Sequence, residues 1–140
     1  MSKSTARILP VLFLLVVSCQ EYQTRHALVG RWTYDLEATR NEMLSRDAAP
    51  SEINYMESIM TTLTQSQLHF KKGGALMFSL ADLEQQGEWA LQASGKELIM
   101  NLTGTEQIST IEYLANDTLI LAPKQTQNGG FPRVLIALPE

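Results

Sequence analysis

The sequence predicts a mainly β domain: an antiparallel meander of seven or eight strands that forms a barrel or half-barrel, with one amphipathic helix inserted between the first and second strands. Three observations predict this fold. Short runs of alternating apolar and polar residues follow one another from Ser66 to the end of the chain. Turn-forming Gly, Asn and Asp residues separate several of these runs, as antiparallel hairpins require. Before Ser66, apolar residues recur at helical spacing instead.

The first strand is predicted over residues 28–34. Gly30, Trp32 and Tyr34 alternate with their neighbours and therefore share one face. Residues 35–46 contain many helix-favouring residues and few β-branched ones, which predicts a short helix or a helical turn.

A clearer helix is predicted from Pro50 to about Thr64, because proline suits the first turn of a helix. Its apolar stripe consists of Ile53, Met56, Ile59, Met60 and Leu63. The opposite face carries Glu52 and Glu57 and no basic residue, which is unfavourable for an anionic membrane. We therefore expect the stripe to pack over one end of the sheet.

The remaining strands are predicted from alternation and from turn residues. Large apolar residues mark their inward faces: Phe70, Leu76, Phe78, Trp89, Leu91, Met100 and Leu119. Residues 73–74 and 116–117 predict turns, and a break in the alternation near residues 110–111 predicts a β-bulge. Residues 125–130 predict a loop, and residues 133–138 predict the last strand.

Residues 1–18 are typical of an export signal. Lys3 and Arg7 supply positive charge, and Ile8 to Val17 form an almost wholly apolar run. A membrane-crossing helix needs about 20 apolar residues, so this run is too short to span a bilayer. We expect the segment to be removed after export.

The end of this signal resembles the lipobox of bacterial lipoproteins, in which a small residue precedes a cysteine that receives diacylglycerol. Here the residues are Val16-Val17-Ser18-Cys19, and Cys19 is the only cysteine of the chain. The alternative is an ordinary secretory signal whose cleavage site contains a cysteine. The resemblance implies lipid attachment at Cys19, a short tether over residues 19–27 and a domain over residues 28–140. It also implies a cell-envelope location, with Gln20 indicating the outer membrane, facing the periplasm.

The net charge of the mature chain disfavours negatively charged partners. Removing Lys3 and Arg7 leaves nine basic residues against fifteen acidic ones, a formal charge of about −6. Such a surface disfavours nucleic acid and anionic headgroups. The acidic residues are scattered, which indicates a solvated surface rather than a recognition patch.

A further resemblance is to the lipocalin-like superfamily, and especially to small bacterial lipocalin-like lipoproteins. It rests on Gly30-Arg31-Trp32, the Asp-x-Glu-Ala-Thr stretch from Asp35 to Thr39, the helical excursion, Phe70 before a glycine turn, and Gly87-Glu88-Trp89. In that superfamily an arginine near the last strand commonly lies over the first-strand indole. The resemblance therefore implies a structural cluster of Gly30, Trp32 and Arg133 at the closed end of the barrel.

Catalytic chemistry finds little support in the sequence. His26 and His69 are far apart and lack companions at metal-ligand spacing, so we expect no metal. A nucleophile beside a positioned base is not evident, and Asp35 and Glu37 suit the first turn of a helix better than acid–base catalysis. We expect no enzyme activity, no catalytic residues and no cofactor.

Two functions remain open. In the first, which the resemblance implies, the barrel binds a small apolar or amphipathic ligand, with Phe70, Phe78, Trp89 and Met100 as candidate ligand-facing residues. In the second, the chain is a structural or interaction lipoprotein that docks on another envelope protein through its helix or a strand edge, with no small ligand. In either case the lipid holds the protein on a membrane.

Overall fold

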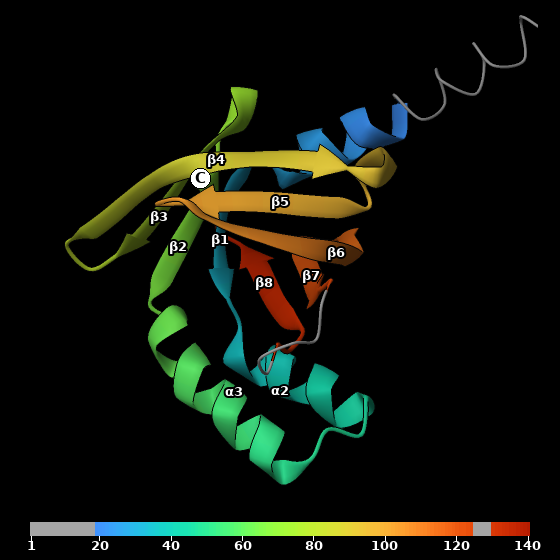
Figure 1. Cartoon of the computed structure of the whole chain (residues 1–140), viewed down its shortest axis with the longest axis vertical. Coiled ribbons are helices and arrows are strands. Elements are labelled where there is room, and N and C mark those ends of the chain that lie inside the picture. Colours follow the sequence, from blue (N-terminus) through green and yellow to red (C-terminus); the bar gives the residue numbers. More distant parts are fainter. Residues whose placement is uncertain (1–18, 125–129) are drawn as a thin grey trace, which may run out of the picture.

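The structure is a computed structural model of the 140-residue chain, and it describes residues 19–124 and 130–140. The expected signal, residues 1–18, lies outside the described residues, as does most of the loop expected over residues 125–130. Figure 1 shows a barrel with two helices at one end and a short helical segment at the other.

Within the described residues, eight strands form a closed antiparallel barrel in which sequence neighbours pair and the last strand pairs with the first. The strands are β1 (Gly30–Tyr34), β2 (Ser66–Phe70), β3 (Ala75–Leu80), β4 (Leu83–Gln92), β5 (Glu97–Leu102), β6 (Thr105–Ala115), β7 (Thr118–Pro123) and β8 (Arg133–Ala137). The predicted antiparallel meander is confirmed, and the barrel is closed rather than half-open.

Two local irregularities of the barrel were also predicted. The register of β6 against β7 shifts between Ile111 and Tyr113, which places the β-bulge one or two residues beyond the predicted position. Asn116 and Asp117 have φ angles of 52° and 60° and join β6 to β7. Both positions belong to residue types that tolerate the left-handed region in turns.

Two helices, α2 (Leu36–Ser45) and α3 (Pro50–Leu63), connect β1 to β2. The helix α2 lies within residues 35–46, where a short helix or helical turn was predicted, and α3 is the predicted amphipathic helix. Asp35 caps α2, because its Oδ1 accepts a hydrogen bond from the N–H of Ala38 at 3.0 Å. In α3, Met56 and Met60 are fully buried. The predicted packing of the apolar stripe over one end of the barrel is confirmed.

Residues 19–28, by contrast, do not form the expected tether. They are helical and lie at the barrel end opposite α2 and α3 (Figure 1). Leu28 is completely buried, and the guanidinium carbon of Arg25 lies 5.3 Å from the centroid of the Trp89 ring. One buried anchor and one cation–π contact thus hold this short segment against the barrel.

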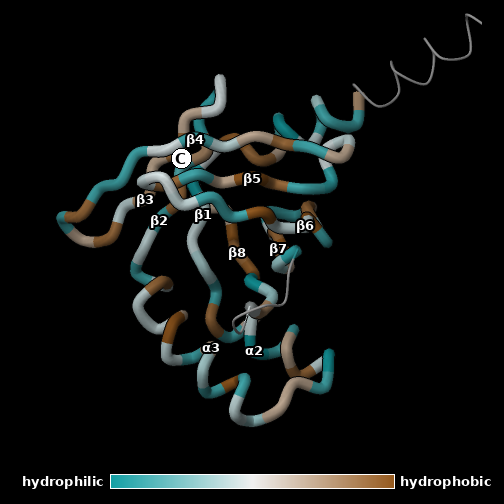
Figure 2. The backbone as a smooth tube through the Cα atoms, viewed as in Figure 1, coloured by the Kyte–Doolittle hydropathy of each residue, from teal (hydrophilic) through white to brown (hydrophobic). Residues whose placement is uncertain are grey.

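The hydrophobic core fills the barrel from this N-terminal end. Phe70 and Trp89 meet edge to face with ring centroids 5.5 Å apart, and both are almost fully buried. Figure 2 shows the hydrophobic and hydrophilic residues that alternate along the strands. Large side chains therefore occupy the barrel interior at this end.

Candidate ligand-binding pocket

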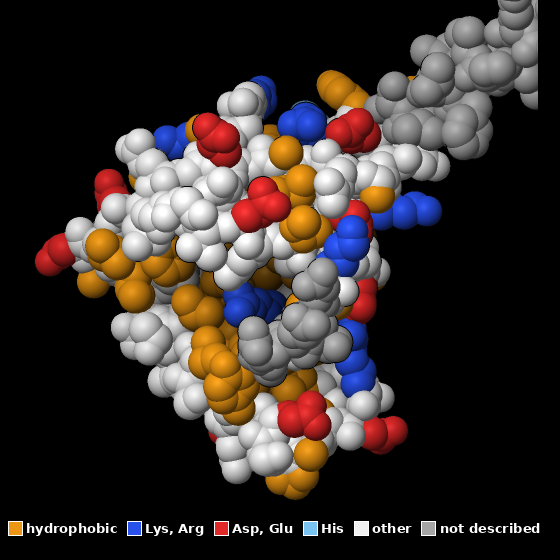
Figure 3. Space-filling view, viewed as in Figure 1, with side chains coloured by type: hydrophobic (Ala, Val, Ile, Leu, Met, Phe, Trp, Pro, Cys, Tyr) orange, Lys and Arg blue, Asp and Glu red, His pale blue; other side chains and the backbone are white. Residues whose placement is uncertain are grey.

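A pocket of about 560 Å³ opens at the α3 end of the barrel. Its described walls come from β1, α3, the strands β5 to β8 and the residues that flank β8: Tyr34, Tyr55, Ile59, Met100, Glu106, Gln107, Ile108, Ser109, Leu121, Pro123, Lys124, Gly130, Phe131 and Arg133. Figure 3 shows a hollow on this face, with basic side chains inside it and hydrophobic side chains of α3 beside it. The volume falls within the range of about 300–1,000 Å³ that is usual for small-molecule sites.

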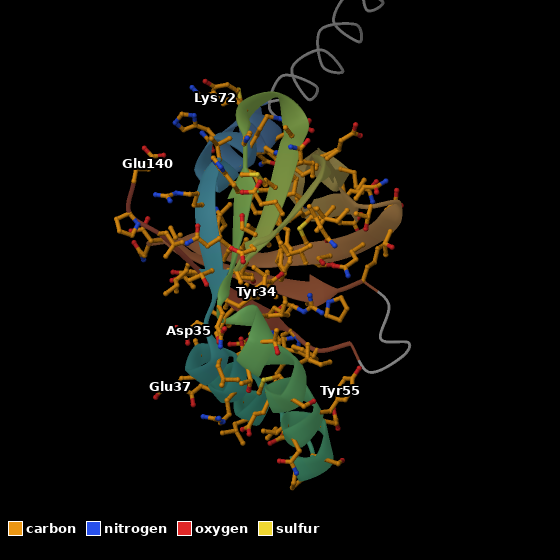
Figure 4. The ribbon with its side chains drawn as sticks, turned by 90° about the vertical axis from the view of Figure 1, so that its left-hand side faces the viewer. Tyr34, Asp35, Glu37, Tyr55, Lys72 and Glu140 are labelled. Carbon is orange, nitrogen blue, oxygen red and sulfur yellow. The ribbon has the colours of Figure 1, made fainter. Side chains whose placement is uncertain are left out.

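The helix α3 supplies one wall of the pocket. Tyr55 and Ile59 lie four residues apart and therefore on one face of the helix. The ring of Tyr55 meets that of Phe131 edge to face, with centroids 6.4 Å apart. Tyr55 remains 48% exposed, so this wall is open to a molecule that enters from solvent. Figure 4 shows Tyr34 where the barrel meets the helices and Tyr55 on α3.

The inner surface of the pocket is apolar. Met100 of β5 and Leu121 of β7 are 5% and 3% exposed and contribute barrel-interior side chains to the lining. Their burial shows that the pocket reaches the barrel core. A ligand that touches them is partly withdrawn from water, which favours an apolar group at that depth.

A guanidinium lies among the aromatic side chains of the pocket. The Cζ of Arg133 is 5.2 Å from the ring centroid of Phe131 and 5.9 Å from that of Tyr34. Burial raises the pKa of the Tyr34 phenol, and the charge of Arg133 partly opposes this rise. Tyr34 therefore stays neutral throughout the physiological pH range.

The other charged groups of the lining lie nearer the rim. The Nζ of Lys124 is 3.1 Å from the Oε2 of Glu97, so this cation is paired. Glu106 is an exposed residue near the start of β6. The pocket thus has one paired cation and one solvated carboxylate near its edge, and Arg133 beside two buried rings.

Of the four predicted ligand-facing residues, the structure places Met100 in the lining of this pocket. Phe70 and Trp89 belong to the filled end of the barrel, and Phe78 is partly buried against the core. These three residues do not line this pocket. Inward alternation identified interior residues but did not indicate which end of the interior is open.

The predicted contact of Arg133 with Trp32 is also corrected, because Arg133 lies over Tyr34 and Phe131. In the antiparallel pairing of β1 with β8, Trp32 is opposite Ala137, whereas Tyr34 is opposite Leu135. Arg133 is therefore four residues, about 13 Å, along β8 from the partner of Trp32. Trp32 instead donates its indole N–H to the carbonyl oxygen of Leu28 at 2.9 Å. Gly30 pairs with Phe70 at the filled end, near the N-terminal helical segment.

Several pocket residues were absent from the sequence-based prediction: Tyr34 as a lining residue, Tyr55, Ile59, Leu121 and Phe131. The predicted strand order already indicated where Tyr34 lies. In a closed antiparallel barrel the end of the first strand lies beside the start of the last one, which brings Tyr34 near Arg133. The sequence predicted that a ligand would lie between the helix and the sheet, but it did not show which side chains of α3 line the pocket, because the angle of α3 to the barrel is a tertiary property.

Three further observations concern Cys19, membrane-spanning helices and metal-binding side chains. Cys19 is exposed, at the start of the described chain. In the described ranges, no helix is both long and apolar enough to cross a bilayer. The same ranges contain no group of three or more His, Cys, Asp or Glu side chains arranged to hold a metal ion.

Comparison with known proteins adds one structural neighbour. No family model and no curated protein matches the sequence. Among solved structures, the chain is similar to the crystal structure of a DUF4847 family protein from Bacteroides vulgatus ATCC 8482, with 14% sequence identity and a TM-score of 0.47. The alignment covers 77% of this chain and 91% of that chain. The fold and the pocket define a small closed antiparallel barrel with a hollow at the end where α3 lies.

Proposed function

We propose that this protein is a lipocalin-like lipoprotein of the bacterial cell envelope that binds one small apolar or amphipathic molecule in the pocket between α3 and the barrel. The observation that carries this proposal is the pocket itself. It has about 560 Å³ of space and buried apolar walls at one end of a barrel whose other end is filled. Such a combination suits a single small ligand.

The composition of the pocket favours binding over catalysis. Its described lining contains one hydroxyl nucleophile of the serine type, Ser109, and neither histidine nor cysteine. Nucleophilic catalysis needs a base within hydrogen-bond reach of the nucleophile, and that base is most often histidine. Apolar walls with a few polar groups suit recognition instead.

Lipid on Cys19 gives this barrel a defined orientation. The helical residues 19–28 follow the attachment site directly and lie against the barrel end opposite α3. An acyl anchor at Cys19 therefore places the filled end toward the bilayer and the pocket away from it. A ligand can then enter from the aqueous side, which in an outer-membrane protein of this orientation is the periplasm.

Native mass spectrometry of the protein purified from its host envelope, without refolding, tests the binding proposal. We expect a co-purifying small molecule with the wild-type chain. Ile59→Glu puts a charge in the apolar wall and should abolish its retention. Leu44→Glu is the matched control, because Leu44 is 53% exposed on α2 and outside the pocket lining.

Retention by wild type and Leu44→Glu, with loss in a folded Ile59→Glu variant, would support ligand binding. A bare wild-type mass, together with exclusion of a neutral hydrophobic dye, would overturn it and favour the structural or interaction lipoprotein. The anchor has its own test, metabolic labelling with an alkyne fatty acid. We expect label on the wild-type protein and none on Cys19→Ser.

A further inference from the structure

Arg133 has no ion-pair partner among the residues that the structure describes. The described residues place no carboxylate oxygen within 4.0 Å of its guanidinium, although four other basic side chains do form ion pairs. Residues 1–18 and 125–129 contain no Asp or Glu. A cation that is partly withdrawn from water is unfavourable unless an anion or several hydrogen-bond acceptors face it.

The neighbours of Arg133 fix the position of this charge. Phe131 and Tyr34 are 6% and 7% exposed, and their rings lie within cation–π distance of the guanidinium. A guanidinium carries five N–H donors, so its contacts with these two rings leave donors available to other acceptors. A carboxylate suits such donors because it can accept two parallel hydrogen bonds.

We infer that the pocket takes an anionic amphiphile, a singly charged carboxylate on an apolar chain or ring system, with the carboxylate paired to Arg133 and the apolar part against α3 and the barrel interior. This inference rests on the proposed ligand binding and specifies its ligand class. Ile59, Met100 and Leu121 provide apolar surface in the same pocket. The neutral phenol of Tyr34 supplies an O–H donor in the lining beside the guanidinium.

The remaining charges favour one negative charge over two. Lys124 is already paired with Glu97, so it adds little attraction. Glu106 also lines the pocket and repels anions. One guanidinium opposed by a nearby carboxylate suits a carboxylate headgroup better than a dianionic phosphate monoester.

Isothermal titration calorimetry tests the inference. The protein, freed of any molecule bound in the pocket, is titrated with decanoate and with decanol. The two probes share an apolar chain and differ in charge. A charge-assisted hydrogen-bond pair commonly contributes about 1.5–3 kcal/mol, so we expect decanoate to bind about 10- to 100-fold more tightly than decanol. Decyl phosphate, at a pH where it is a dianion, should bind more weakly than decanoate.

Variants then locate the headgroup. Arg133→Met should weaken decanoate binding by about 10- to 100-fold and leave decanol binding within about threefold. Arg133→Lys keeps the charge but loses the planar fork, so it should restore decanoate binding only in part. Arg40→Met is the matched control: it removes a cation that is paired with Glu57 and lies outside the pocket lining, and should change decanoate binding less than about threefold.

The outcomes separate the two proposals. Equal affinities of wild-type protein for decanoate and decanol, or equal weakening of both by Arg133→Met, would refute the anionic ligand while ligand binding itself stands. Binding of neither probe by folded protein, with a bare native mass, would refute ligand binding as well. The wild-type comparison needs no variant, so the inference remains testable even if Arg133→Met does not fold.

Discussion

The indole Nε1 of Trp32 donates a hydrogen bond to the carbonyl oxygen of Leu28 at 2.9 Å, and this bond joins the N-terminal helical segment to the first strand of the barrel. Leu28 itself is 0% exposed and belongs to the core. The Gly-x-Trp motif thus provides a specific attachment point for residues 19–28. In the proposed lipoprotein, the position of a lipid on Cys19 relative to the barrel would depend on this attachment.

Leu28→Ala should lower the free energy of unfolding by about 2–5 kcal/mol, because it removes a fully buried side chain and leaves a cavity. Tyr22→Ala in the same helical segment is the control. Tyr22 is 69% exposed, so its replacement should change stability by less than about 0.5 kcal/mol. Urea denaturation followed by circular dichroism measures both. Equal, small effects of the two replacements would mean that the segment is a free tether.

The sequence predicted the strands and the helix in which buried apolar residues recur at a regular spacing. Alternation of large apolar residues located the inner faces of β2 and β5, and Phe70 and Met100 are buried as expected. The stripe of α3 was equally clear, because Met56 and Met60 lie against the core. These patterns are strong since each buried residue has to face the same side of its element.

Elements without a regular spacing of buried apolar residues were not predicted. The first half of β4, residues 83–88, is mostly exposed, so no apolar alternation marks it. The preceding turn has Ala81 at a φ of 50° instead of a Gly or Asn. The helix over residues 19–28 was not predicted, because its one fully buried side chain, Leu28, cannot produce an apolar repeat at helical spacing. Pocket residues depend on which end of the barrel stays unfilled, and that follows from three-dimensional packing.

Gly87 should be irreplaceable for a steric reason. A Cβ at this position would lie 1.9 Å from the carbonyl oxygen of Asn101 on the paired strand β5, and backbone cannot move aside as a flexible side chain can. Gly87→Ala should therefore destabilise the fold by about 3 kcal/mol or more. We expect a large drop in the midpoint of thermal unfolding.

Gly104→Ala provides the contrast. Gly104 has a φ of +81°, but a Cβ there would meet no atom within 4 Å, so conformational strain of about 1–2 kcal/mol is the main cost. Thermal unfolding of both variants under one set of conditions compares the two effects. A smaller loss for Gly87→Ala than for Gly104→Ala would contradict the close strand approach.

Thr39 connects the inserted helices to the last strand. Its Oγ1 accepts a hydrogen bond from the N–H of Val134 at 3.0 Å and donates one to the carbonyl oxygen of Asp35 at 2.7 Å. Thr39 is fully buried, so Thr39→Val would leave the Val134 N–H without its partner. We expect a loss of about 1–3 kcal/mol in unfolding free energy.

Thr39→Ser tests whether the hydroxyl is responsible. It keeps both hydrogen bonds and removes only a methyl group, so its loss should be about 1 kcal/mol. Amide hydrogen exchange at Val134 offers a local measurement, and we expect faster exchange in Thr39→Val than in Thr39→Ser. Equal protection in the two variants would rule out the hydrogen bond as the link between α2 and β8.

The imidazole of His69 on β2 should titrate below its ordinary pKa. Partial burial lowers this pKa most, followed by the charges of Lys71 and Arg31, and Glu140 opposes them. Between the ordinary pKa and the lowered one, the unfolded chain binds a proton that the folded chain does not. Stability should therefore rise with pH across this window, which lies on the acid side of the ordinary histidine pKa.

NMR titration of the His69 ring protons checks this effect directly. Lys71→Gln removes a repelling charge and should move the pKa of His69 upward, toward its ordinary value. Lys72→Gln, in the adjacent turn, is the control, because Lys72 is not among the charges that shift His69; Figure 4 shows Lys72 and Glu140 on this part of the molecule. A His69 pKa above the ordinary value in the wild-type protein would mean that the attraction of Glu140 exceeds burial and both basic neighbours, and the strand would then have to present this side chain differently.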